Sequence, residues 1–351
     1  MDSIQTSPDS AREPLGLITL AIVAYNEHDA LPDILSDVLA QDFPRSYIEI
    51  ILVDSASTDD TRAIMEEFAQ TYSGVDSGFK SVRVLDNPAR IIPAGWNVAL
   101  RAFSGDAFLR IDAHARIPSD FVRMNVTVLN EGEYVCGGSR PATVSPDTPW
   151  TRTLLMAEES AFGSSVADYR QGSEKKYTSA VFLPAFRREV IERVGLYDER
   201  LLRTEDNDYC YRIRTAGFRI RFDARIHSTQ VARNTLGGMM RQKYGNGYWV
   251  GRTAFIQPKC LHAYHFAPFI MVVGALVLAL SAAITSGWIP LVGCVVLYLA
   301  LCVVLAVRSV MQANRRFAAF LALPLLFPCI HVSYGIGTSA GLLTGIARGR
   351  K

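Results

Sequence analysis

Between Leu17 and Asp112 the chain alternates short apolar runs with amphipathic segments, and this alternation restricts the possible fold more than any other feature. We expect the apolar runs to form buried strands, at residues 17–24, 47–53, 82–85 and 107–112. We expect the amphipathic segments between them to form helices, at residues 30–41, 61–69 and 93–103. Strands that alternate with helices of this length form βαβ units, so the prediction is an α/β fold with a mostly parallel sheet flanked by helices.

Acidic side chains follow three of these strands. Glu27, Asp54 and Asp112 each come at or just after a strand end. Right-handed crossovers place the carboxyl ends of parallel strands along one edge of the sheet, where such folds bind ligands. We therefore expect the three acids to share one site, which would be a nucleotide site.

His114 follows Asp112 by two residues, a spacing that places two side chains on one face of an extended strand. A carboxylate and an imidazole together can hold Mn or Mg that also carries phosphate oxygens. The alternative is that Asp112 caps a turn and that His114 is an ordinary loop residue.

The second half of the soluble region is less regular. We expect helices at residues 150–162, 188–194 and 205–215, an apolar segment at 180–187 and a polar connection at 163–177. The last helix begins with Glu205, Asp206 and Asp208, and acids in a first turn are explained in part by the helix dipole. One cap is enough for a helix, so at least one of these acids is available for another role.

Four short motifs fall in the order found in one enzyme family. Ala24-Tyr25-Asn26-Glu27, the segment 53–59, Asp112-Ala113-His114 and Thr204-Glu205-Asp206 resemble the motifs of family 2 glycosyltransferases, which have the GT-A fold. The segments 87–97 and 110–114 are similar to the branch typified by the succinoglycan glycosyltransferase ExoA. The resemblance covers roughly residues 17–252 and implies a nucleotide-diphosphate sugar as donor.

The resemblance also implies site residues. The donor would be bound by Ala24, Tyr25, Glu27, Asp54 and Asp112. In the family's DxD motif a second acid follows Asp112, and here His114 takes its place. A divalent metal, Mn or Mg, would be held by Asp112 and His114.

Two further motifs concern catalysis. Asp206 matches the general base of inverting members. The family's Gln-x-x-Arg-Trp motif is present only in part, as Gln242 and Trp249 with a longer spacing, which disfavours a processive polymerase. Arg241, Lys243 or Arg252 could contact the donor diphosphate instead.

These roles agree with the chemistry of glycosyl transfer. Attack of a hydroxyl on an anomeric carbon passes through an oxocarbenium-like state. The leaving diphosphate needs a cation, and the attacking hydroxyl needs a carboxylate to take its proton. Glu205 or Asp208 would raise the pKa of Asp206 by like-charge repulsion.

The C-terminal part predicts a membrane region. Residues 266–285 and 289–307 are each long and apolar enough to cross a bilayer, and the linker between them is short enough for a hairpin. Arg308, Arg315 and Arg316 after the second span favour a return to the cytoplasm. Residues 317–346 are apolar but contain Pro and Gly, so they form one kinked span or a re-entrant hairpin. The expected domains are a flexible tail (1–16), a GT-A domain (17–260) and a membrane region with two to four transmembrane or re-entrant helices (261–351).

The function expected from all of this is a multi-pass cell-membrane enzyme whose catalytic domain faces the cytoplasm. It would transfer a sugar, with inversion, to a membrane-associated and lipid-linked acceptor in exopolysaccharide or glycolipid synthesis. Two alternatives remain open, a processive polysaccharide synthase and a non-catalytic membrane scaffold that binds nucleotide sugars. The net charge of +2 gives no indication of a nucleic-acid partner.

Overall fold

The computed structural model describes residues 14–73, 78–160, 162–163, 176–312 and 317–349. It divides the chain into two compact units, the first made of residues 1–141 and 167–230 and the second of residues 142–166 and 231–351. This division differs from the boundary expected at residue 260, because a helix that begins at Leu236 packs within the second unit. Residues 1–13 of the expected tail and most of the expected polar connection at 163–177 lie outside the described residues.

An eight-stranded sheet forms the centre of the first unit, in the order β3-β2-β1-β4-β9-β6-β10-β8. Its parallel half consists of β1 (Ile18–Ala24), β2 (Ile48–Asp54), β3 (Ser81–Asp86) and β4 (Ala107–Asp112). β9 (Phe182–Arg187) runs antiparallel between β4 and β6 (Val135–Ser139), β10 (Ile220–His227) is parallel to β6, and β8 (Lys176–Thr178) is antiparallel to β10. The mostly parallel sheet is thus confirmed, and all four strands expected from the alternation are present.

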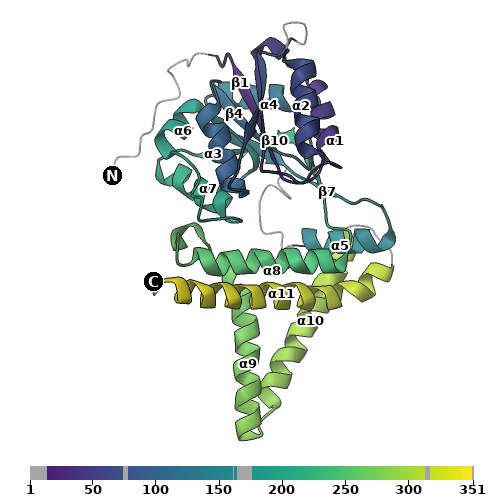
Figure 1. Cartoon of the computed structure of the whole chain (residues 1–351). Coiled ribbons are helices and arrows are strands. Elements are labelled where there is room, and N and C mark those ends of the chain that lie inside the picture. The colour runs from purple at the N-terminus through teal and green to yellow at the C-terminus, as the bar shows by residue number, and fades with distance from the viewer. Residues whose placement is uncertain (1–13, 74–77, 161, 164–175, 313–316, 350–351) are drawn as a thin grey trace. The chain divides into compact units, whose positions relative to one another are not determined.

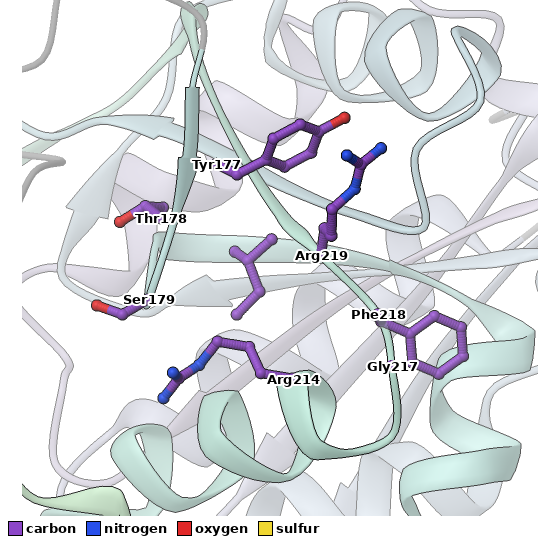
Figure 2. Close-up of a pocket in the computed structure, with 8 residues that line it drawn as sticks. Tyr177, Thr178, Ser179, Arg214, Gly217, Phe218 and Arg219 are labelled. Atoms are coloured by element: carbon purple, nitrogen blue, oxygen red, sulfur yellow. The ribbon is translucent and has the colours of Figure 1, made fainter. Parts of the chain in front are cut away.

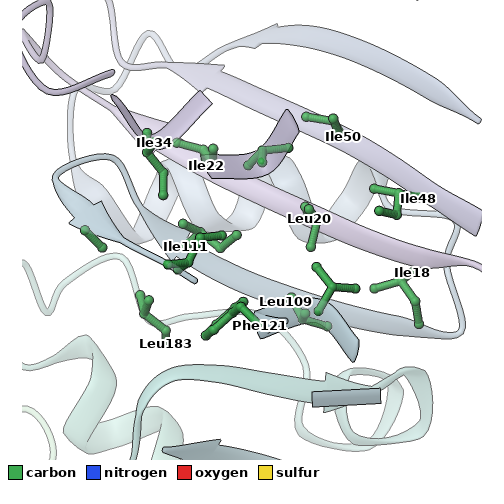
Figure 3. Close-up of a cluster of buried hydrophobic side chains, with 14 of the residues drawn as sticks. Ile18, Leu20, Ile22, Ile34, Ile48, Ile50, Leu109, Ile111, Phe121 and Leu183 are labelled. Carbon is green, nitrogen blue, oxygen red and sulfur yellow. The ribbon is translucent and has the colours of Figure 1, made fainter. Parts of the chain in front are cut away.

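Helices cover both faces of this sheet (Figure 1). One face packs against α1 (Leu31–Leu39), α2 (Thr61–Tyr72) and α4 (Phe121–Asn130), and the other against α3 (Ile92–Ala102), α6 (Arg188–Val194) and α7 (Glu205–Thr215). Side chains alternate along each strand, so Leu20 and Ile22 enter the first layer (Figure 3) while Ala21 enters the second. Two short strands, β5 (Ala115–Arg116) and β11 (Thr229–Val231), pair antiparallel beyond the rim of the sheet.

Among its described residues, the second unit is helical apart from β7 (Ala142–Thr143) and Val231, the last residue of β11. It contains α5 (Pro149–Glu159), α8 (Leu236–Thr253), α9 (Ala267–Thr285), α10 (Ile289–Gln312) and α11 (Phe317–Gly349). The last three are long and apolar enough to cross a membrane. α11 is one continuous helix with Pro324 and Pro328 inside it, so of the two expected alternatives the structure has the single segment and not the re-entrant hairpin.

Glycines allow α8 and α11 to pack closely. A Cβ on Gly247 of α8 would clash with the carbonyl oxygen of Tyr334, and one on Gly341 of α11 would clash with that of Tyr248. The Ser333 hydroxyl donates to the Met240 carbonyl oxygen at 2.8 Å. Small residues let two helix backbones approach in this way, and the close contact continues along most of α8.

Candidate active site

The carboxyl ends of the parallel strands lie at one edge of the sheet. Ala24 is paired with Asp54, and Asp54 with Asp86, while Asp112 is paired with Val23. The sheet therefore brings together the strand ends that carry the expected donor residues, as the right-handed crossover rule predicts.

The loops after β1 and β2 are tied to each other by side chains. Asn26 adopts a positive φ of 53°, its backbone N–H donates to the Ser57 hydroxyl, and its side-chain oxygen accepts from the Thr58 N–H at 2.8 Å. The Glu27 N–H donates to the Thr61 hydroxyl. These hydrogen bonds hold the backbone of the loop that contains Tyr25 and Glu27. The Tyr25 side chain is half exposed.

Asp54 is buried and is held within its own loop. Its Oδ1 accepts from the Ser57 N–H at 3.2 Å, and Arg62 lies 3.9 Å from its Oδ2. The Ser57 hydroxyl accepts from the Asn26 N–H and does not cap α2, although the spacing of Ser57 to Asp60 resembles a capping box. The Thr61 N–H is instead satisfied by Asp59 Oδ1.

Arg110 connects β4 with the start of α7. It is buried in the strand, yet its guanidinium donates to the carboxylate of Asp206 and lies 3.4 Å from Asp112 Oδ1 and 3.8 Å from Glu205 Oε1. Its guanidinium carbon lies 4.4 Å from the centre of the Trp96 ring, a cation–π contact from α3. The expected base and the expected DxD acid are therefore held by one cation.

Burial and neighbouring charges shift the pKa values of Arg110 and Glu205 in this cluster. Burial acts to lower the pKa of Arg110, but the carboxylates of Asp206 and Asp112 outweigh it and raise that pKa well above its usual range. Burial and the charge of Asp206 raise the pKa of Glu205 well above the ordinary 4.5. Glu205 Oε2 is buried and has no hydrogen-bond partner in the part of the chain that the structure describes. By contrast, the side chain of Asp206 is 55% exposed and open to a substrate.

Arg110 was not among the expected site residues, and Glu205 was expected there only as one of two acids that could raise the pKa of Asp206. An arginine inside an otherwise apolar buried strand is the signal that could have found Arg110, because such a charge is retained only with carboxylate partners. Trp96 and Tyr197, whose ring centre is 5.9 Å from the guanidinium carbon, complete the surroundings of Arg110. Nothing in the local sequence of α3 indicated that Trp96 would face this site.

Asp112 and His114, the two residues expected to hold a divalent metal, lie at and just after the carboxyl end of β4. His114 Nδ1 lies 3.2 Å from Glu27 Oε1, and both side chains are partly exposed. Within the described ranges no group of three or more His, Cys, Asp or Glu could hold a metal ion. The donor set of Asp112 and His114 fits an ion that takes its remaining ligands from diphosphate oxygens and water, as Mg²⁺ commonly does. The metal ligands stay a prediction.

The remaining expected residues belong to the second unit. Arg241 is exposed on α8, and Gln242 and Trp249 lie on the same helix. The role of Arg241 in donor binding stays a prediction.

The first unit has a hollow of about 510 Å³ at the other end of α7, lined by Tyr177, Arg214 and Arg219 among others (Figure 2). It adjoins the start of β10, at the edge of the sheet opposite to Asp112 and Asp206, so it is not the donor site.

Comparison with known proteins decides the family. The profile of the family described as glycosyl transferase family 2 matches residues 19–195, about half of the chain. The chain belongs to glycosyltransferase family 2. The matched segment includes Ala24, Glu27, Asp54 and Asp112 and ends before Asp206.

Two relatives and one solved structure are similar to this glycosyltransferase. The succinoglycan biosynthesis protein ExoA of Rhizobium meliloti is 28% identical over 56% of this chain, and the match spans 58% of its own length. A Methanococcus voltae protein is 21% identical over 94% of this chain and 98% of its own; it is a dolichyl N-acetyl-alpha-D-glucosaminyl phosphate 3-beta-D-2,3-diacetamido-2,3-dideoxy-beta-D-glucuronosyltransferase. The mannosyltransferase PcManGT of Pyrobaculum calidifontis, solved with GDP-Man and Mn2+, has a TM-score of 0.61 at 18% identity and covers 97% of this chain and 91% of that one. These similarities confirm the expected ExoA-like branch and the GT-A fold.

Proposed function

We propose that this family 2 glycosyltransferase is a membrane-bound, inverting enzyme that moves a sugar from a nucleotide diphosphate to a lipid-linked acceptor. The observation that carries the proposal is the Arg110 cluster, in which Asp206 and Asp112 are held by one buried guanidinium at the carboxyl edge of the sheet. This arrangement keeps a base for the acceptor hydroxyl close to a residue expected at the donor diphosphate.

Asp206 would act as the base. Its carboxylate stands in the first turn of α7, largely exposed, with one oxygen engaged by Arg110. The acceptor hydroxyl would lose its proton to Asp206 as its oxygen bonds to the anomeric carbon. The bond from that carbon to the diphosphate breaks on the opposite face, so a single displacement inverts the configuration.

Donor binding would use the rim of the parallel strands. Glu27, Asp54 and the loop from Ala24 to Tyr25 would hold the nucleoside, and Arg241 the diphosphate. A divalent ion held by Asp112 and His114 would supply positive charge to the leaving diphosphate when bound.

The lipid-linked acceptor is supported by two observations. The second unit has three helices apolar and long enough to cross a membrane. The Methanococcus voltae relative, which matches almost the whole chain, is named for transfer to a dolichyl-linked sugar phosphate. A cytoplasmic position of the catalytic unit would give it access to cytosolic nucleotide sugars, and the multi-pass region would hold it at the acceptor.

The test uses the purified full chain in liposomes with polyprenyl-diphosphate-linked sugar, a panel of radiolabelled nucleotide sugars, and Mn²⁺ or Mg²⁺. We expect label from one donor to enter the organic phase as one added sugar with inverted anomeric configuration. A long polymer would favour a processive synthase, and label only in water-soluble glycan would contradict the lipid-linked acceptor.

The variant Asp206→Asn separates an enzyme from a scaffold. We expect transfer to fall by about 10³-fold or more, as for loss of a general base, while donor binding, measured as a rise in melting temperature, persists. Asp29→Asn is the matched control, because Asp29 is an exposed acid in the loop before α1. Unchanged transfer in Asp206→Asn would exclude Asp206 as the base.

A further inference from the structure

Helix α11 has two different faces along its length. Its exposed side chains fall on one stripe, because their spacing returns to the same side of a helix of 3.6 residues per turn. Within residues 321–347, where the exposure of α11 is described, all the exposed residues are apolar: Leu321, Leu325, Cys329, Val332, Ile336, Leu343, Ile346 and Ala347. The opposite face carries Leu326, Phe327 and Ile330, which are buried in the core of the second unit.

The buried face of α11 packs along a polar helix. Gly337 and Gly341 lie against the backbone at Tyr244 and Tyr248 of α8, and Arg252 donates to the Thr344 carbonyl oxygen at 3.2 Å. The two helices therefore run side by side in the same direction over most of α8. Any depth that α11 takes in a bilayer is imposed on α8 as well.

Charged groups on α8 make the hydrocarbon interior a poor place for it. Lys243 is buried and paired with Glu158 of α5 at 3.3 Å, but Arg241 is exposed. If α11 crossed the membrane, the exposed Arg241 would be carried to membrane depth, which is costly in lipid.

The hairpin of α9 and α10 is apolar all round. Only 6% of the candidate span in α9 and 11% of that in α10 are buried, against 44% in α11. Pro268 of α9 contacts Gly335 in the middle of α11, and Cys302 and Ala306 of α10 are buried with Leu323. From these contacts α9 and α10 project together away from α8 and α11, which lie across their base (Figure 1).

We propose that α9 and α10 alone cross the membrane and that α11 lies in the plane of the bilayer surface, with its exposed stripe in the lipid. An amphipathic helix that lies flat buries its apolar face at the boundary between headgroups and acyl chains. The stripe adjoins the place where α9 contacts α11, because Pro268 lies against Gly335 next to the exposed Ile336, and this is why we assign the stripe to lipid and not to a protein partner. The inference rests on the proposed membrane location but not on the proposed reaction.

The first test is topology in sealed membrane vesicles of both orientations. With full-length chains that carry an epitope at either end, we expect protease to reach both epitopes from the same side, since two crossings return the chain. Trp288→Cys, made in a chain with Cys294→Ala and Cys329→Ala, should react with an impermeant maleimide only from the opposite side. Epitopes on opposite sides would mean that α11 crosses, and labelling of Trp288→Cys from the epitope side would mean that the hairpin does not. Either result overturns the proposal.

The second test measures depth with spin labels in liposomes. Leu325 and Leu343 are separated by 18 residues, about 27 Å along a helix, which is close to the full hydrocarbon thickness of about 30 Å. We expect labels at Leu325→Cys, Val332→Cys and Leu343→Cys to report one common depth by collision with oxygen and a nickel chelate. Labels at Val292→Cys, Val296→Cys and Val304→Cys on α10 are the control and should differ in depth. A depth maximum near Val332 would overturn the proposal. Neither test uses the sugar donor, so a failure of glycosyl transfer is distinguished from a failure of this inference.

Discussion

Arg110 determines the electrostatics of the candidate active site. Its guanidinium contacts Asp206 and lies near Asp112, and its own position is fixed by Trp96. Such an arginine acts through the residues that it positions, because it holds the expected base in one orientation. Its effect should therefore appear in the pH dependence of the reaction as well as in the rate.

We expect Arg110→Gln to lower kcat by about 100-fold, the order of loss caused by a misplacement of about 1 Å at a reacting group. Removal of the positive charge favours protonated carboxylates, so the acidic limb of the pH–rate profile should move to higher pH. Arg110→Lys keeps the charge and should show a smaller displacement of that limb. A reduced rate with an unmoved pH profile in Arg110→Gln would mean that Arg110 is only structural.

Glu205 is a second residue whose environment predicts a measurable effect. Because burial raises its pKa above 4.5, the unfolded chain loses this proton at lower pH than the folded chain. The folded state then binds more protons, and stability falls as pH rises above 4.5. We expect Glu205→Gln to raise the melting temperature at pH 7 by about 2–4 °C, the shift that about 1 kcal/mol gives a unit of this size.

The difference between Glu205→Gln and the unchanged chain should shrink towards zero as pH falls below 4.5, where both chains are uncharged at this position. Differential scanning fluorimetry in detergent across this range measures it. A variant that is less stable at neutral pH would show that Glu205 is held ionised by Arg110.

At the scale of elements, the sequence predicted the parallel half of the sheet well, because each strand there falls on a short, mostly apolar run between amphipathic segments. The paired strand ends of Ala24, Asp54 and Asp112 follow from that pattern and from crossover handedness. The contact of Arg110 with α7 did not follow, since it joins residues far apart in sequence through tertiary packing. α4 and β6 were likewise not predicted, and α11 was left between two alternatives because Pro324 and Pro328 are accommodated within its helix.

The close packing of α8 on α11 gives a prediction at the same scale. Gly247→Ala places a methyl group against the Tyr334 carbonyl oxygen, so we expect a loss of about 1–3 kcal/mol, as for other overpacked sites. Gly237→Ala is the control on the same helix, because a Cβ there meets nothing within 4 Å. It should be neutral or stabilising by up to about 1 kcal/mol, since Ala favours helix more than Gly. Equal melting temperatures of the two variants would contradict the close contact.

At the scale of the whole molecule, the candidate catalytic residues and the helices that could cross a membrane belong to different units. The first unit carries the strand-end acids and Asp206, and the second carries the apolar helices. If the acceptor is a lipid, as proposed, enzyme and acceptor meet by diffusion within the bilayer. The relevant acceptor concentration is then its fraction among membrane lipids and not its amount per volume of solution.

This gives a prediction that separates a lipid acceptor from a soluble one. With enzyme and polyprenyl-linked acceptor in the same liposomes, adding inert lipid at constant bulk acceptor concentration should lower the transfer rate in proportion to the acceptor's mole fraction, as long as that fraction is below saturation. With a short-chain, water-soluble acceptor analogue the same dilution should leave the rate unchanged, because that acceptor arrives from solution. Donor dependence should be the same in both series, since the nucleotide sugar is soluble. A rate that follows bulk concentration for both acceptors would mean that the membrane anchors the enzyme without presenting its substrate.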